Sequence, residues 1–379
     1  MPTKPKLKVA LVFDDTLDSS DGVAQYVKTV GAWLAGQGHE VCYLVGETKM
    51  TKWSGGRVYS LSRNVAVKFN GNKLSIPARA NTQKIAEILA KEKFDVLHVQ
   101  TPFSPFMAGQ IIKRAGPAAV VSTFHILPSG ALSSLGSRLL RLVTKQGLKR
   151  FDEASAVSPA AIEFARQAYG LNCQLIPNTI DVASFRSRFG PQNGRIVFLG
   201  RLVKRKGCGL LIKAFAQIHQ QFPEARLVIG GRGSMLDEFK RLAKRLGLDR
   251  KVEFVGYVSE GRKSQFLAEA SIACFPATGG ESFGIVLIEA MAAGSGVVLG
   301  GDNPGYHSVL AEQPQLLFDP GSEKELAGRL ASILSDRTVA DGLHAWQVAH
   351  VNSYDINIVG PQIEVMYRQA VAKRAKAKA

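Results

Sequence analysis

Cysteine is scarce in this chain, which has only four among 379 residues: Cys42, Cys173, Cys208 and Cys274. They are scattered along the sequence, and none of their spacings is typical of a metal site. We therefore expect a reduced cytoplasmic protein whose thiols are structural, without a metal-binding cluster.

Long hydrophobic runs are also missing. No apolar run reaches the ~18–20 residues that a membrane-spanning helix needs. The opening "MPTKPKLKVALVF" is charged, but it leads directly into a strand-like segment and contains no small-residue cleavage site. We therefore expect a first strand here rather than a signal peptide.

Acidic residues are in deficit. There are 31 Asp and Glu against 48 Lys and Arg, which gives a formal net charge of +17. A basic chain attracts nucleic acid, anionic lipid or phosphorylated substrates. Because no basic pattern interleaved with aromatic residues and no nucleic-acid motif is present, no nucleic-acid partner is expected. Composition leaves the choice between the other two open.

A strand–helix–strand pattern occurs in both halves of the chain. It covers 8–13, 23–38 and 40–46 in the first half, and 195–200, 206–222 and 225–231 in the second. Such units form parallel sheets, and the length suits two domains of roughly 150–200 residues. The sequence therefore predicts two doubly wound α/β domains, with sites at the carboxyl ends of strands and in the cleft between domains.

The segment "GGESFGIVLIEAMAAG" (279–294) contains two carboxylates, Glu281 and Glu289. In one continuous helix they would lie about 12 Å apart along the axis, whereas paired glycosidase carboxylates lie ~5–9.5 Å apart. We therefore expect a loop that carries Glu281 and a helix that starts near Gly284 and contains Glu289. The N–H groups of 282–284 would then bind phosphate. The alternative is an ordinary strand–helix turn with Glu289 on a solvated face.

The run "FLGRLVKRKG" (198–207) places Arg201, Lys204, Arg205 and Lys206 just after a strand. Cations there can neutralise a diphosphate leaving group without a metal. A solvated basic loop is the alternative. The glycine-rich "GGRGSM" (230–235) predicts a turn that lets the backbone approach a ligand.

The first half offers weaker candidates. Asp21 can cap a helix that begins at Gly22, and His125 stands at a strand end, where a structural role is the alternative. A stripe of basic side chains lies within 137–150 and consists of Arg138, Arg141, Lys145 and Lys149. It predicts a helix lying on a membrane surface, or an ordinary helix with a core face and a solvated face.

The segments 200–207 and 279–294 together resemble the retaining glycosyltransferases of family four, which have the GT-B fold of two Rossmann-like domains facing a cleft. Within that family the chain resembles the phosphatidylinositol mannosyltransferases. The resemblance runs from about residue 8 to 368 and includes "DGVAQYV" (21–27), "FDVLHV" (94–99), "TFH" (123–125) and "IPNTIDVASF" (176–185). It implies an acceptor-side domain at 1–190 and a donor-binding domain at 191–354. A helix at about 355–379 is expected to pack back on the first domain.

The resemblance also implies roles for individual residues. Glu281 would bind hydroxyls of the donor sugar, and Glu289 would hold the ribose. Arg201 and Lys206 would stabilise the leaving diphosphate, so that no essential metal or other cofactor is expected. The remaining donor-binding residues would be Gly22, Ser282, Phe283 and Gly284, with His125 at the donor sugar and Asp18 and Asn70 on the acceptor side.

The implied reaction is a retaining transfer of a hexose, mannose from GDP-mannose in particular, to a phosphatidylinositol-like lipid. The alternative is a UDP-sugar donor with diacylglycerol, a polysaccharide or a small molecule as acceptor. The enzyme would be a monomer or weak dimer, bound peripherally to the anionic cytoplasmic face of the membrane.

Several features depart from the family pattern. Asp21-Gly22 replaces the usual Gly-Gly, which adds a carboxylate near the phosphates. Gln100-Thr101-Pro102 stands where a His-Glu-Pro-like run is common.

Overall fold

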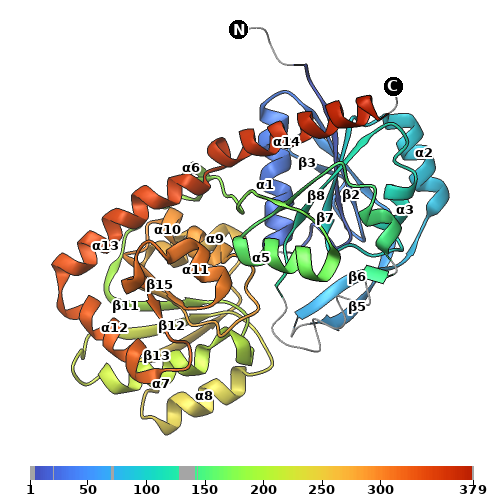
Figure 1. Ribbon diagram of the computed structural model, residues 1–379. Coiled ribbons are helices and arrows are strands. Elements are labelled where there is room, and N and C mark those ends of the chain that lie inside the picture. The colour runs from blue at the N-terminus through green and yellow to red at the C-terminus, as the bar shows by residue number, and fades with distance from the viewer. Residues whose placement is uncertain (1–4, 20, 70–71, 128–140, 143, 378–379) are drawn as a thin grey trace. The chain divides into compact units, whose positions relative to one another are not determined.

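The computed structural model describes the chain except residues 1–4, 20, 70–71, 128–140, 143 and 378–379 (Figure 1). The chain forms two compact units. Unit 1 comprises Met1–Thr179 and Ile356–Ala379, and unit 2 comprises Ile180–Asp355. The first boundary thus falls at Thr179 rather than near residue 190.

Unit 1 is built on an eight-stranded sheet in the order β10-β9-β8-β7-β1-β2-β4-β3. Its strands are parallel except for the β3–β4 pair. A separate antiparallel hairpin joins β5 (Ser62–Phe69) to β6 (Asn72–Ala80). The sheet strands are β1 (Lys8–Phe13), β2 (Glu40–Val45), β3 (Lys52–Trp53), β4 (Gly56–Ser60), β7 (Val96–Thr101), β8 (Ala119–Phe124), β9 (Glu153–Ala156) and β10 (Gln174–Leu175).

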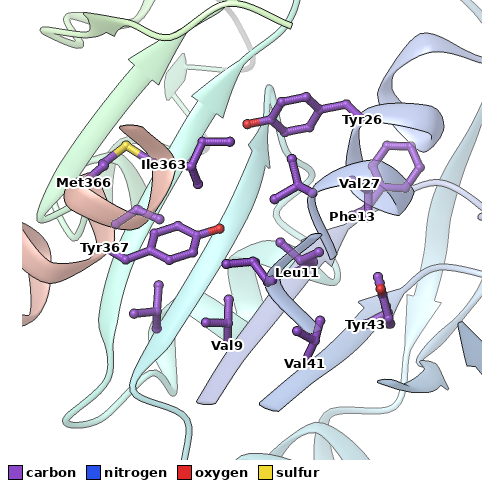
Figure 2. Close-up of a cluster of buried hydrophobic side chains, with 14 of the residues drawn as sticks. Val9, Leu11, Phe13, Tyr26, Val27, Val41, Tyr43, Ile363, Met366 and Tyr367 are labelled. Atoms are coloured by element: carbon purple, nitrogen blue, oxygen red, sulfur yellow. The ribbon is translucent and has the colours of Figure 1, made fainter. Parts of the chain in front are cut away.

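The helices of unit 1 pack against this parallel sheet, whose central strands are buried on both faces and therefore consist mainly of apolar residues. Figure 2 shows side chains of β1, β2, α1 and α14 gathered in one cluster. The helix α14 fits closely, because a Cβ on Gly360 would lie 2.6 Å from the Trp33 ring of α1. The described helices are α1 (Gly22–Gly36), α2 (Thr82–Glu92), α3 (Ala108–Lys113), α5 (Pro159–Phe164), η1 (Ala165–Tyr169) and α14 (Ile356–Lys376).

Unit 2 contains a six-stranded parallel sheet in the order β13-β12-β11-β14-β15-β16. The chain starts at β11, moves outward to β13, and returns to the other side of β11 with β14. This reversal of strand order is the place where open α/β sheets bind ligands. The strands are β11 (Gln192–Leu199), β12 (Arg226–Gly230), β13 (Val252–Gly256), β14 (Ala270–Phe275), β15 (Val297–Gly301) and β16 (Leu317–Phe318).

The helices of unit 2 connect these strands as in a Rossmann-like domain, so the predicted doubly wound α/β architecture is confirmed in both units. Among the described residues, no helix is both long and apolar enough to cross a membrane. The helices of unit 2 are α6 (Val182–Phe185), η2 (Lys204–Lys206), α7 (Cys208–Ile218), α8 (Leu236–Arg245), α9 (Glu260–Ala268), α10 (Ile285–Ala293), α11 (Pro304–Leu310), η3 (Pro314–Leu316), α12 (Glu323–Ser335), α13 (Arg337–His350) and η4 (Val351–Tyr354).

Candidate active site

Two loops meet at the carboxyl ends of the neighbouring strands β11 and β14. The N–H of Thr278 donates to the carbonyl oxygen of Arg205 at 2.8 Å. Gly207 has a φ of +72°, and a Cβ at this position would lie 1.8 Å from the carbonyl oxygen of Pro276. Only glycine therefore allows the two loops to approach this closely.

Glu281 in the second loop is paired with two cations of the first. Its Oε1 lies 2.6 Å from Nη1 of Arg205 and 2.8 Å from Nζ of Lys206. Burial alone would raise the pKa of Glu281, but the charges of Lys206 and Arg205 outweigh it and the pKa is lowered. The pKa of Lys206 is also lowered, mainly by burial. The cluster therefore combines one ionised carboxylate with two cations, an excess of positive charge suited to an anionic ligand.

Arg201 belongs to the same basic loop and is exposed. Its charge contributes to the lowered pKa of Lys206. The structure thus brings Lys206 and Glu281 into contact, and Arg201 lies in the same basic loop. The sequence named Arg205 as one of the cations after the strand, but its pairing with Glu281 was not predicted.

The helix α10 begins at Ile285, with Gly284 as its N-terminal cap, so the predicted start near Gly284 is confirmed. Gly284 has a φ of +110°, and a Cβ there would lie 2.6 Å from the Tyr306 ring. The cap residue Gly284 has no side chain, so within the described part of the chain the first N–H groups of α10 receive no hydrogen bond from a cap side chain. The segment Ser282–Gly284 that leads into it follows Glu281 directly, and the Phe283 side chain is buried.

Glu289 lies inside α10 and is buried, so the alternative of a solvated face is wrong. Its Oε1 is 2.9 Å from Nζ of Lys263 in α9, and that ammonium also lies 2.8 Å from Glu260. Burial raises the pKa of Glu289 despite Lys263. Burial would lower the pKa of Lys263, but the charges of Glu289 and Glu260 outweigh it and the pKa is raised. Sequence reasoning missed Lys263, because nothing in its helix pattern indicates a partner in another helix.

The two glutamates have different partners in the described structure. Glu281 pairs with the basic loop, and Glu289 pairs with Lys263. A carboxylate dyad that shares a proton would need the two groups in contact, with one pKa strongly raised by the other charge. The separate ion pairs instead agree with two glutamates that would contact a ligand at two different places.

The glycine-rich segment 230–235 packs against the loop that follows β11. A Cβ on Gly231 would lie 1.8 Å from the oxygen of Gly200, and one on Gly233 would lie 2.1 Å from the oxygen of Leu202. In addition, the N–H of Leu202 donates to the carbonyl of Arg232 at 2.9 Å. The observed close approach is therefore to protein backbone, and an approach of this segment to a ligand stays a prediction.

In unit 1, Asp21 caps α1 as predicted, because its Oδ1 accepts from the N–H groups of Val23 at 2.9 Å and Ala24 at 3.1 Å. Gly22 is the first residue of that helix. Asp18 accepts from the N–H of Lys49 at 2.9 Å and thereby joins the loops that follow β1 and β2. The acceptor-side residue Asn70 lies outside the described residues.

His125 follows β8 directly and is buried. Its Nε2 lies 2.8 Å from Oε1 of Gln100, and its ring meets the Tyr26 ring edge-on at 4.8 Å. Burial lowers the pKa of His125 to about 3, so its imidazole is neutral near pH 7.

The basic stripe is described in part, because Arg138 lies outside the described residues. Arg141, Lys145 and Lys149 are exposed, and so is Leu142, whose relative exposure is 70%. Thr144 and Leu148 are buried. This segment thus has an inner face, and its outer face carries basic residues and an exposed leucine.

The comparisons with known proteins agree with this arrangement. "Glycosyltransferase Family 4" matches residues 20–184, and "Glycosyl transferases group 1" matches residues 180–346. A phosphatidyl-myo-inositol mannosyltransferase of Mycolicibacterium smegmatis is 31% identical over 370 residues, covering 95% of this chain and 93% of the relative. This chain belongs to glycosyltransferase family 4.

A further relative and two solved structures are also similar to this family 4 glycosyltransferase. A phosphatidyl-myo-inositol mannosyltransferase of Propionibacterium freudenreichii is 29% identical and covers 96% of this chain and 95% of the relative. Among solved structures, a glycosyltransferase of Rickettsia africae matches with a TM-score of 0.75 at 16% identity, over 97% of this chain and 99% of the other. A sucrose-phosphate synthase of Thermosynechococcus elongatus matches with a TM-score of 0.75 at 20% identity, over 96% and 99%. These likenesses confirm the GT-B fold, and the family makes the protein an enzyme, a hexosyltransferase.

Proposed function

We propose that this glycosyltransferase moves mannose from GDP-mannose to a phosphatidylinositol-like lipid, with retention of the α configuration. The observation that carries the proposal is the pairing of Glu281 with Arg205 and Lys206, in the same basic loop as Arg201. Cations at this position offset the charge that develops on a departing diphosphate, which is the role a metal plays in other transferases. No essential metal or other cofactor is therefore required.

The donor is anchored at both ends in this proposal. Glu281 binds hydroxyls of the sugar, and Glu289 binds the ribose. The separate ion pairs of the two glutamates support two different contacts with the donor. The diphosphate lies at the amino end of α10, where Ser282, Phe283 and Gly284 offer N–H groups and the helix dipole favours negative charge. Gly22 lets its loop come near the phosphates, and His125 contacts the sugar.

The acceptor is an inositol-type head group in the proposal, with Asp18 and Asn70 on the acceptor side. The names of the Mycolicibacterium and Propionibacterium relatives support this substrate class. The basic segment around Arg141, Lys145 and Lys149 provides the contact with an anionic membrane surface, on its cytoplasmic side. The enzyme acts there as a peripheral protein, a monomer or weak dimer.

The test is a transfer assay with purified protein and phosphatidylinositol vesicles. We expect GDP release and a mannosylated lipid with GDP-mannose, at a rate that EDTA leaves unchanged. Parallel reactions with UDP-glucose, UDP-galactose and UDP-N-acetylglucosamine should give no product. Turnover with a UDP sugar on diacylglycerol would replace the proposed donor and acceptor but keep the family assignment.

A further inference from the structure

Three charged side chains of unit 2, Glu260, Lys263 and Glu289, form what we call the α9–α10 cluster. Glu260 is the first residue of α9, Lys263 follows it three positions later, and Glu289 lies in the first half of α10. A helix that follows a parallel strand begins at the carboxyl edge of the sheet, where open α/β domains bind their ligands. The cluster therefore lies towards that edge of the unit 2 sheet.

The ammonium of Lys263 bridges the two carboxylates. Its Nζ lies 2.9 Å from Oε1 of Glu289 and 2.8 Å from Oε2 of Glu260. The side chains of Lys263 and Glu289 are 9% and 7% exposed, whereas that of Glu260 is 41% exposed. Within the described part of the chain, Oε2 of Glu289 receives no hydrogen bond, and it is not one of the fully enclosed oxygens. A carboxylate oxygen in this position can accept from a ligand.

Lys263 also determines the charge of Glu289. Burial raises the pKa of Glu289, Lys263 opposes that rise, and Glu260 adds to it; these are the charged groups that act on Glu289 in the described structure. Without the ammonium, burial and the charge of Glu260 would both favour the protonated carboxyl. An ionised carboxylate only accepts hydrogen bonds, whereas a protonated carboxyl donates one and has less acceptor capacity.

The α9–α10 cluster has the opposite charge balance to the basic loop. Glu281 with Arg205 and Lys206 combines one carboxylate with two cations. The α9–α10 cluster combines two carboxylates with one cation. Negative surroundings repel phosphate, and an acceptor-only oxygen requires a partner that carries a hydrogen. The cluster therefore suits a neutral part of a ligand that bears hydroxyl groups.

We propose that Lys263 is a positioning residue that keeps Glu289 ionised and holds its Oε2 as the acceptor by which the protein selects a ribose with free hydroxyls. The inference rests on the proposed function, which places Glu289 at the ribose of the donor. Lys263 acts through Glu289, so its loss should weaken the recognition of the ribose hydroxyls and leave the recognition of the diphosphate intact.

Calorimetric titration of the full-length protein with GDP and with 2′,3′-dideoxy-GDP isolates this effect. The wild type should prefer GDP at least about tenfold, the effect of one hydrogen bond. Lys263→Met should lose most of this preference, whereas Lys263→Arg keeps a cation and should retain it. The control is Arg195→Met, which breaks another ion pair of unit 2, with Glu269 at 3.4 Å, and should leave the preference unchanged.

The pH profile separates positioning from a merely structural role. The phosphates titrate in both nucleotides alike, so the ratio of the two dissociation constants reports on the ribose contact. In Lys263→Met the preference for GDP should return only as the pH rises and Glu289 ionises, so its profile moves to higher pH than that of the wild type. Glu289→Gln, which cannot ionise, should show a weak preference at every pH between 5.5 and 8.5.

The outcomes distinguish this inference from the proposed function. An unchanged preference and pH profile in Lys263→Met, with normal binding by the wild type, would overturn the role of Lys263 alone. An equal loss of affinity for both nucleotides in Lys263→Met would show a structural role and would also overturn it. If the wild type binds UDP but not GDP, the proposed donor is wrong, and UDP with its dideoxy analogue gives the same test. Binding of neither nucleotide would refute the proposed function and the inference together.

Discussion

The ammonium of Lys263 lies 2.9 Å from the carboxylate of Glu289, and both side chains are less than a tenth exposed. Removing one partner of such a buried ion pair leaves the other charge buried and uncompensated. We expect Lys263→Met to reduce the free energy of unfolding by about 3 kcal/mol, measured by urea titration.

Removing both charges should recover part of that loss. The double variant Lys263→Met with Glu289→Gln leaves no buried charge uncompensated, so its stability should exceed that of Lys263→Met alone. A double variant as unstable as the sum of the single variants would show that the pair does not interact.

The basic loop provides a test of the proposed leaving-group role. Lys206→Ala should lower kcat about 10²–10³-fold, as the loss of one preorganised partner for a developing charge does elsewhere. Lys204→Ala is the matched control, because Lys204 is an exposed lysine of the same loop, whereas Lys206 is the lysine that pairs with Glu281. Equal activity of the two variants in the transfer assay would contradict the assignment of Lys206.

Gly207 should not tolerate a side chain. With a φ of +72° and a Cβ that would lie 1.8 Å from the Pro276 oxygen, Gly207→Ala must displace one of the two loops. We expect a lower melting temperature and most of the transfer activity lost. Gly190→Ala is the control, because a Cβ there has no neighbour within 4 Å in the described structure. Full activity in Gly207→Ala would mean that the loops need not meet.

Asp14 should make stability depend on pH. It follows β1 and accepts from the N–H groups of Ser104 and Ala108, and burial raises its pKa from 3.8 to about 6. A raised folded-state pKa means that the carboxyl stabilises the protein fully below pH ~4, and that this stability is lost as pH rises through ~6.

The expected size of that loss is roughly 2–3 kcal/mol. We therefore predict that Asp14→Asn removes this part of the decline in unfolding free energy between pH 4.5 and 7, whatever its absolute stability. Identical pH slopes for the variant and the wild type, measured by urea titration, would refute the raised pKa.

Membrane contact should depend on the outer face of the 141–149 segment. Neutralising Lys145 and Lys149, both to Gln, should weaken binding to anionic phosphatidylinositol vesicles, measured by co-sedimentation, about thirtyfold, because each cation near such a surface contributes ~1 kcal/mol. Lys240 and Lys244, also exposed on a basic helix, form the control pair in unit 2. A similar loss in both pairs would indicate attraction by net charge rather than by this segment.

Sequence reasoning found the features that are encoded locally. The apolar runs predicted the parallel strands of both units, and the loop expected around Glu281 predicted where α10 begins. The structure adds that Gly284, the residue before the helix, has a positive φ. The basic run at 201–206 and Glu281 were likewise visible as residue types that follow strands.

The missed features depend on partners far apart in the sequence. Lys263 reaches Glu289 across two helices, and Gln100 reaches His125 across two strands. The chain pattern of each element indicates which face is buried but not which polar side chain meets which. Which polar side chains pair is decided by how the helices and strands pack, and only the folded units show that packing.

The helix α14 follows unit 2 in the chain, yet its Ile363, Met366 and Tyr367 belong to the core of unit 1 (Figure 2). During synthesis on the ribosome, unit 2 therefore has all its residues before unit 1 does. While the 176 residues Ile180–Asp355 are translated, the apolar surface of unit 1 that α14 later covers has no partner helix. This order makes the early half of the chain the part that most needs chaperone protection before release.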